Sequence, residues 1–204
     1  MVRKLDPDKH EARRRAILTA AAACFADRGF HQTSTADLCA AAGTSPGNLF
    51  HYFPSKSAII AAIIDQEAEE TAAYFATLTG DDPLGDLLRF LDLALDLAAD
   101  PAYVRLALET AAEASRDSLV AVRVARNDAA LQEALRGLLR AAAARSRIDP
   151  ALDPTAAAAW IGALIDGLFN RVALDPDFRP QEQRAALRRM ALRFLAVGDD
   201  GAAS

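Results

Sequence analysis

Short polar side chains and polar aromatic rings recur within residues 45–52, a stretch that carries no acidic residue. The amide of Asn48 can pair with both hydrogen-bonding groups of adenine, and the imidazole of His51 can reach a guanine acceptor or a phosphate. Ser45 and Tyr52 add hydroxyl groups, which bind phosphate oxygens in many protein–DNA complexes. The stretch therefore has side chains suited to the phosphates and base edges of a nucleic acid.

Two short helices separated by a tight turn are predicted to position these side chains. The first covers about residues 35–42, with Ser34 as its N-cap and Asp37 near its positive end. Gly43 and Thr44 form the turn, and the second helix covers about residues 45–53. The two helices are expected to share a small core made of Leu38, Cys39, Ala42, Leu49, Phe50 and Phe53. This is a helix-turn-helix layout, in which the second helix enters the major groove of DNA.

Residues 12–56 resemble the N-terminal domain of the TetR family of bacterial transcriptional regulators. The match consists of an arginine-rich first helix and then Phe25, Gly29-Phe30, Thr33, Asp37-Leu38, Ala40, Ala42-Gly43, Ser45, Gly47, Leu49, Tyr52-Phe53 and Lys56. Its most specific part is the ending Gly-x-Leu-aromatic-x-Tyr-Phe-x-x-Lys. The resemblance implies an all-α fold with a three-helix DNA-binding head and a helical bundle for ligand binding and dimerisation. It also implies a repressor that a small molecule releases from its operator.

Position by position, the resemblance implies a set of DNA-binding residues. Thr33 and Ser34 would meet a phosphate at the start of the helix at 35–42, and Lys56 would meet another. The residues expected at the groove are Thr44, Ser45, Pro46, Gly47, Asn48, His51 and Tyr52. Two positions depart from the family pattern, because Pro46 stands where Lys or Arg is frequent and Phe50 stands where Tyr is commonest. Both departures remove a possible contact with the DNA backbone, so the sequence predicts modest affinity for each head.

A basic stretch precedes the helix-turn-helix and contains Arg3, Lys4, Lys9, Arg13, Arg14 and Arg15. It either adds phosphate contacts that compensate for these departures or is simply a solvated helix face. Salt titration separates the two, since each lost phosphate contact lowers the slope of log K against log[salt] by about 0.9.

Helical signals cover the remaining chain, with about nine helices in all. They are expected near residues 8–27, 35–42, 45–53, 56–78, from 83, 101–115, 117–147, from 154, and up to 197. Proline or aspartate-proline pairs mark several starts, including Pro83, Pro101 and Asp153-Pro154. We predict a DNA-binding domain at 1–56 with a basic arm at 1–8, a ligand-binding and dimerisation domain at 57–198, and a disordered tail at 199–204.

Residues 156–165 are apolar on every side of a helix, which predicts burial on both faces. One face can meet the protein's own core, and pairing with a second copy would cover the other. The expected interface residues are Trp160, Leu164, Leu168, Leu187, Met190 and Phe194. A homodimer also suits the function, because two heads would reach half-sites about 34–36 Å apart.

The effector pocket that the resemblance implies lies in the bundle. Its candidate residues are Phe75, Phe90, Leu91, Leu108, Glu109 and Val120. Glu109 stands in an otherwise apolar segment at 103–112, and two interpretations stay open. It is either a surface carboxylate near a helix end or a counter-charge for a cationic ligand.

Charge is divided unevenly along the chain. The net charge is −5, yet residues 1–60 carry +3 and the remainder carries −8. An acidic body held away from the phosphates would favour docking by the head. The two cysteines, Cys24 and Cys39, form no CxxC pair and are expected to be buried, reduced thiols.

The sequence predicts a cytoplasmic protein that is not an enzyme, needs no cofactor or metal, and binds no membrane. No signal peptide is recognisable, and no uninterrupted apolar stretch reaches the length of a spanning helix. Di-iron bundles, zinc hydrolases and phosphate-binding loops each need a motif, respectively Glu-x-x-His pairs, HExxH and GxxxxGK[ST], that the sequence lacks. The expected partners are double-stranded operator DNA, an unknown small-molecule effector and a second copy of the chain. The alternative is a helical protein-interaction module without sequence-specific DNA binding.

Overall fold

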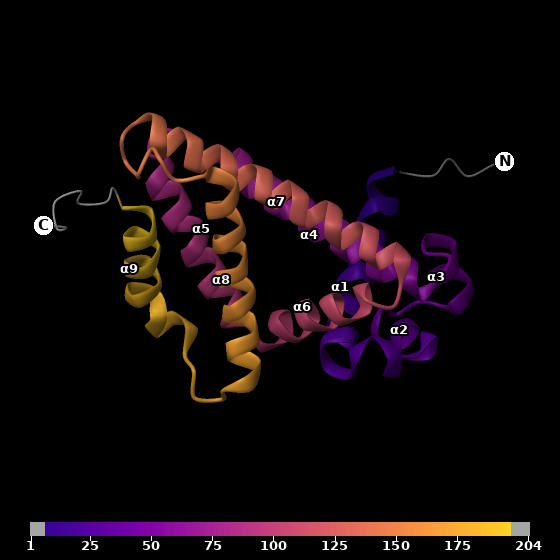
Figure 1. Cartoon of the computed structure of the whole chain (residues 1–204). Helices are drawn as coiled ribbons and strands as arrows, with labels where there is room; N and C mark the ends of the chain where they lie inside the picture. The colour runs from indigo at the N-terminus through magenta and orange to yellow at the C-terminus, as the bar shows by residue number, and fades with distance from the viewer. Residues whose placement is uncertain (1–6, 197–204) are drawn as a thin grey trace, which may run out of the picture. The chain divides into compact units, whose positions relative to one another are not determined.

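The computed structural model describes residues 7–196, which form helices joined by turns and loops and contain no strand. The helices are α1 (Pro7–Gln32), α2 (Thr35–Ala41), α3 (Pro46–Tyr52), α4 (Lys56–Ala76), α5 (Pro83–Ala98), α6 (Pro101–Ala114), α7 (Ser118–Ala144), α8 (Pro154–Leu174) and α9 (Arg184–Leu195), with a 3-10 turn η1 (Pro180–Gln183) (Figure 1). The all-α prediction is confirmed. The predicted tail and most of the predicted basic arm, including Arg3 and Lys4, lie outside the described residues.

The chain divides into two compact units. The first contains Met1–Ala68 and Arg105–Asn127, and the second contains Glu69–Val104 and Asp128–Ser204. Helices α4, α6 and α7 therefore contribute residues to both units. The functional boundary expected at residue 56 stays a prediction.

The first unit is built around α1, which bends near its C-terminal end. The largest fully buried side chains of this unit come from α1 to α4 and are Ile17, Leu18, Phe25, Phe30, Leu38, Leu49, Ile59, Ile60 and Ile64. Gly29 breaks the helical path with φ 76° and ψ 166°, and one further turn follows it. That turn brings the ring of Phe30 edge-on to Phe25, with their centroids 4.8 Å apart. Gly29 therefore interrupts α1 two residues after the end expected at Asp27, but the helical segment continues to Gln32.

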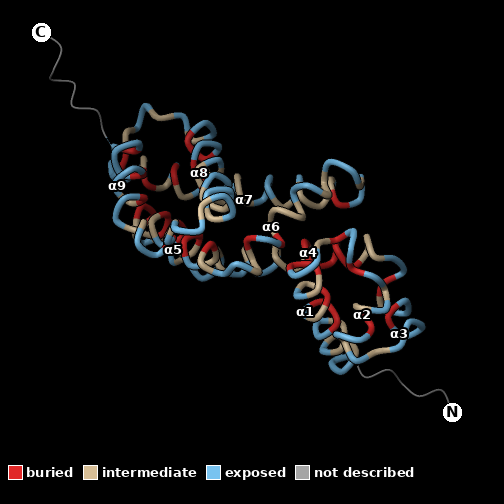
Figure 2. The backbone as a smooth tube through the Cα atoms, turned by 90° about the horizontal axis from the view of Figure 1, so that it is seen from below, coloured by how far each residue is buried: buried red, intermediate tan, exposed pale blue. Residues whose placement is uncertain are grey.

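The second unit has a leucine-rich core between α5, α8, α9 and the C-terminal half of α7. α5 and α8 lie side by side, as do α5 and α9, and their buried residues face one another (Figures 1 and 2). The core includes Leu87, Leu91, Leu95, Leu135, Leu139, Ile161, Leu187 and Leu195. Asp92 of α5 binds Arg184 and Arg188 of α9, and the hydrogen bond from Arg188 holds the pKa of that carboxyl below its usual range.

Helix α8 is long and apolar enough, by length and composition alone, to cross a membrane. Asp166 and Arg171 interrupt its apolar sequence, however. Ala157, Ala158, Ile161 and Ile165 are buried in the core of the second unit. The core that these side chains help to form accounts for the hydrophobicity of one face of α8.

The two cysteines are free thiols in the described part of the chain. Cys39 is buried, as expected, whereas Cys24 is half-buried. Burial raises the pKa of the Cys24 thiol, which makes it a weaker nucleophile.

Candidate DNA-binding face

The turn between α2 and α3 is fixed by local caps and by one arginine from α1. Ser34 caps α2 by accepting a hydrogen bond from the Asp37 amide, and Asp37 accepts one from the Ser34 amide in return. The Ser34 hydroxyl also donates to the Asp37 carboxylate at 2.6 Å, and this bond, with the one from the Ser34 amide, holds the pKa of Asp37 below its ordinary value. At the other end of α2, Gly43 has φ 55°, and the guanidinium of Arg13 donates to the carbonyls of Ala42 and Gly43 at 3.1 and 2.7 Å. α3 therefore starts from a closed and well-defined turn.

Helix α3 buries one narrow stripe and exposes the rest of its surface. Leu49 is buried and Tyr52 is half-buried, while Ser45, Pro46, Gly47, Asn48, Phe50 and His51 are exposed. The Ser45 side chain caps the helix at the Asn48 amide, and the Asn48 side chain donates to Thr44 Oγ1 at 2.7 Å. A methyl group added at Gly47 would meet nothing within 4 Å. The predicted groove residues from Ser45 to His51 thus lie on one exposed helix, and Gly47 leaves its backbone bare.

The prediction that Phe50 belongs to the core is wrong. Its ring is 46% exposed, whereas Leu49 and Phe53 are almost completely buried. Successive residues of a helix are turned by about 100°, so Phe50 cannot share the inner face with Leu49. Leu49 and Phe53, one turn apart, fill that face by themselves.

The side chains of Thr33 and Lys56 make hydrogen bonds inside the first unit, and the phosphate contacts expected of these two residues stay a prediction. Thr33 is buried, and its hydroxyl donates to the Gly29 carbonyl at 2.7 Å. The ammonium of Lys56 donates to the carbonyls of Phe30 and Thr33 at 2.7 and 3.3 Å. Both side chains therefore close the end of α1, where backbone carbonyls lack helical partners. Ser34 stays exposed, so its predicted role is compatible with this geometry.

Several basic side chains near the start of α1 already have partners. Arg13 holds the α2–α3 turn, and Arg14 and Arg15 lie 3.7 and 3.2 Å from the carboxylate of Glu11. Nearby, the ring of His10 stacks on Tyr52 with centroids 4.5 Å apart. The start of α1 therefore supports the C-terminal end of α3 as well as carrying charge.

Three charged residues at helical spacing on α6 hold the C-terminal end of α1. Arg105 donates to the Ala26 carbonyl at 2.7 Å, and Glu109 accepts a hydrogen bond from the Phe30 amide at 3.1 Å. One turn further, Glu113 lies 3.1 Å from His31 Nε2. Glu109 is thus bound to the backbone of α1 and is not a free surface carboxylate, while its role toward a ligand stays a prediction. The i, i+4, i+8 spacing was visible in the sequence, but its partner was not.

The predicted pocket residues are divided between the two units, and the site that they were expected to form stays a prediction. Phe75, Phe90 and Leu91 belong to the second unit, while Leu108, Glu109 and Val120 belong to the first. Leu91 and Val120 are completely buried. None of the six lines either of the two cavities described next.

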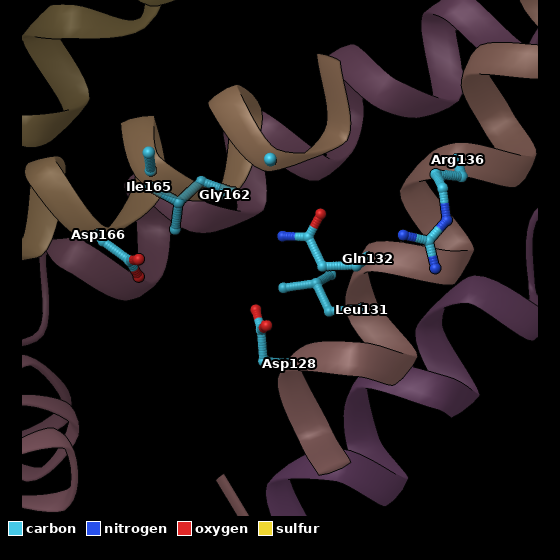
Figure 3. A pocket seen from close by; sticks show the side chains of 9 residues that line it. Asp128, Leu131, Gln132, Arg136, Gly162, Ile165 and Asp166 are labelled. Atoms are coloured by element: carbon cyan, nitrogen blue, oxygen red, sulfur yellow. The ribbon is translucent and has the colours of Figure 1, made fainter. Parts of the chain in front are cut away.

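The first cavity lies between α7 and α8, with a volume of about 400 Å³. The side chains of Asp128, Gln132 and Asp166 point into it (Figure 3). Burial, followed by the charge of Asp128, raises the pKa of Asp166. Arg136 also lines the cavity, but its guanidinium donates twice to Glu133. The unneutralised charge at this cavity is therefore negative, a feature that no motif in the sequence indicated.

The second cavity is an apolar groove of about 340 Å³ between α8 and α9. It contains four of the six predicted interface residues, namely Trp160, Leu164, Met190 and Phe194. Leu168 is half-buried beside the core, and Leu187 is buried within it. The core of its own chain thus already covers most of the Leu187 side chain, and the interface as a whole stays a prediction.

A capped turn followed by a short helix with an exposed polar face defines a helix-turn-helix DNA-binding protein. Residues 17–63 match the family described as "Bacterial regulatory proteins, tetR family", and residues 83–196 match "BetI-type transcriptional repressor, C-terminal". The chain belongs to the TetR family of transcriptional regulators, and it is a helix-turn-helix regulator of transcription.

Individual relatives agree with this assignment over nearly the whole chain. The transcriptional repressor Rv1474c of Mycobacterium tuberculosis is 30% identical over 194 residues, which cover 90% of this chain and 94% of the relative. The structure of Salmonella enterica GusR is 30% identical, with a TM-score of 0.76 over 90% of this chain and 95% of GusR. A regulator from Saccharomonospora viridis, solved in complex with choline, shares the fold at 21% identity, with a TM-score of 0.75 over 90% of this chain and 96% of its own. The relatives named as regulators are not enzymes.

Proposed function

We propose that this regulator represses transcription in the cytoplasm by placing α3 in the major groove of its operator and that a small molecule releases it. The exposed face of α3 carries this proposal. This face presents the polar side chains of Ser45, Asn48 and His51 together with the exposed backbone of Gly47. It carries no acidic side chain that would repel phosphates. A short helix that starts at a rigid turn is the element that helix-turn-helix proteins use to read base edges.

Replacing Asn48 or His51 by alanine is expected to weaken operator binding by about 10-fold, since a lost base contact costs about 1–3 kcal/mol. Both side chains are exposed, so folding should not change. Fluorescence anisotropy on a labelled duplex from the DNA upstream of its own gene measures the effect. The slope of log K against log[salt] should stay the same for a base contact and fall by about 0.9 for a phosphate contact.

Gln181→Ala is the matched control, because Gln181 is exposed on η1, far along the chain from α3. It should bind as the wild type does. If the wild-type protein shows no preference for the upstream duplex over random duplex at moderate salt, the proposal fails and the protein-interaction alternative stands.

We further propose a homodimer formed through the apolar groove between α8 and α9. Trp160, Met190 and Phe194 expose large apolar side chains there, and α8 is otherwise short of polar residues on this side. Exposed apolar patches of this kind usually mark a protein interface. A two-fold dimer would present two copies of α3 to two half-sites.

The cavity between α7 and α8 is our candidate for the effector site. The carboxylates of Asp128 and Asp166 face it without an ion-pair partner among the described residues, which favours a small molecule with a positively charged group. α7 continues from this cavity into the first unit, since Ser118–Asn127 belong to that unit. The choline complex of the S. viridis regulator shows that a protein of this fold can hold a small cation.

Replacing Asp128 and Asp166 together by asparagine should abolish the response to a cationic effector. A thermal-shift screen of small amines and quaternary ammonium compounds identifies compounds that raise the melting temperature of the wild type. The double variant should lose the shift and the release from DNA but keep operator binding. Asp177→Asn is the control, because Asp177 is exposed in the loop between α8 and η1 and lies outside the cavity lining. Equal shifts in wild type and double variant would rule out this cavity.

A further inference from the structure

Phe50 is an exposed apolar ring on the helix proposed to enter the major groove. Among the described residues from α1 to α6, it is the only large hydrophobic side chain that is clearly exposed. The other exposed aromatic rings, Trp160 and Phe194, lie in the groove between α8 and α9. Phe50 belongs to neither the core nor that groove, so its exposure needs a separate explanation.

The exposed surface of α3 has an apolar edge and a polar edge. With Leu49 facing inward, a rotation of about 100° per residue puts Gly47 and His51 at the centre of the outer face. Pro46 and Phe50, one turn apart, then lie on one edge, and Asn48 lies on the opposite edge, bonded to Thr44. The apolar edge offers no hydrogen-bond donor or acceptor from a side chain.

The major groove contains one apolar group, the C5 methyl of thymine, among hydrogen-bond donors and acceptors. A phenyl ring cannot pair with a phosphate or with any polar base edge, so an apolar contact is its only favourable one there. We propose that Phe50, flanked by Pro46, contacts the methyl group of one thymine in each operator half-site. Phe50 is therefore a specificity-determining residue, an inference that rests on the proposed DNA-binding function of α3.

Replacing thymine by deoxyuridine tests this directly, because it deletes the methyl group and leaves base pairing unchanged. Operators are first selected from a pool of random duplexes with the full-length wild-type protein. Each thymine of a selected operator is then replaced in turn, and affinity is measured by anisotropy. One position in each half-site should lose about four-fold in affinity, as expected for one buried methyl group.

The variants assign the effect to Phe50. Phe50→Ala should bind the thymine operator more weakly and become insensitive to deoxyuridine at that position. Phe50→Leu keeps an apolar side chain and should keep part of the sensitivity, and His51→Ala should keep all of it. Because Phe50 is outside the core, circular dichroism spectra should not change.

Two outcomes would overturn the inference, and they are distinguishable from failure of the proposed function. If the wild type binds its selected operator but no deoxyuridine position matters, Phe50 reads no methyl group. If Phe50→Ala keeps the wild-type sensitivity, another residue reads it. Failure to select any operator from the random pool would instead refute sequence-specific binding itself.

Discussion

Replacing Trp160 and Phe194 together by glutamate is expected to convert the protein into folded monomers and to weaken operator binding by about 100-fold or more. The two side chains are 68% and 43% exposed and line the apolar groove between α8 and α9. Burying an aromatic ring contributes about 1.5–3 kcal/mol, and a two-fold interface counts each ring twice. A carboxylate in the same place would be buried without a partner, which is strongly unfavourable.

Light scattering after size exclusion and anisotropy on the operator measure these two effects. Val122→Glu is the matched control, since Val122 is 65% exposed on α7 and lies outside the groove. The control should stay dimeric and bind DNA normally. A double variant that remains dimeric at micromolar concentration would show that the groove does not hold the two copies together.

The second large effect is expected from Gly29→Ala, which should lower the free energy of unfolding by about 2–3 kcal/mol. Gly29 has φ 76° and ψ 166°, a conformation that residues with a Cβ rarely adopt. A Cβ at this position would also lie 3.1 Å from a carboxylate oxygen of Glu109. The substitution therefore strains the backbone and crowds the residue that accepts the Phe30 amide hydrogen.

Thermal and denaturant unfolding measure the loss, and two further variants separate its causes. Combining Gly29→Ala with Glu109→Ala removes the crowding but leaves the backbone strain. The substitution Glu109→Ala should therefore lower the free energy of unfolding less in the Gly29→Ala background than in the wild type. Gly137→Ala lies within α7, where an added Cβ meets nothing within 4 Å. It should stabilise the protein by about 0.5–1 kcal/mol. Wild-type stability in Gly29→Ala would contradict the assigned roles of Gly29 and Glu109.

Local signals in the sequence were sufficient to place the helices. Proline at the start of α5, α6 and α8 fixes φ within one residue, and the Ser34–Asp37 capping box acts over three residues. The predicted bounds consequently agree with the observed helices within a few residues, except at α1. The motif around α3 likewise identified the family, because its residues are close together in the chain.

Side chains on a short helix were harder to assign to a face. α3 has seven residues, so it can bury only one narrow stripe, and the sequence offered more apolar residues than that stripe can hold. Phe50 was left exposed for this reason. Helix α9 shows a related case. Its apolar residues are divided by packing between the core, which takes Leu187, and the exposed groove, which takes Met190 and Phe194.

The sequence by itself determined the class of fold, the helix boundaries and the position of the helix-turn-helix, because these depend on interactions within a few residues. Only the tertiary structure decided which polar groups satisfy one another. Arg13 reaches the α2–α3 turn 30 residues away, Lys56 reaches Phe30 across 26, and Glu109 reaches Phe30 across 79. The local sequence around each of these side chains is equally compatible with a position facing solvent or a ligand. Helix packing settled the choice, because a buried carbonyl or amide at a helix end destabilises the folded protein unless a partner completes its hydrogen bond.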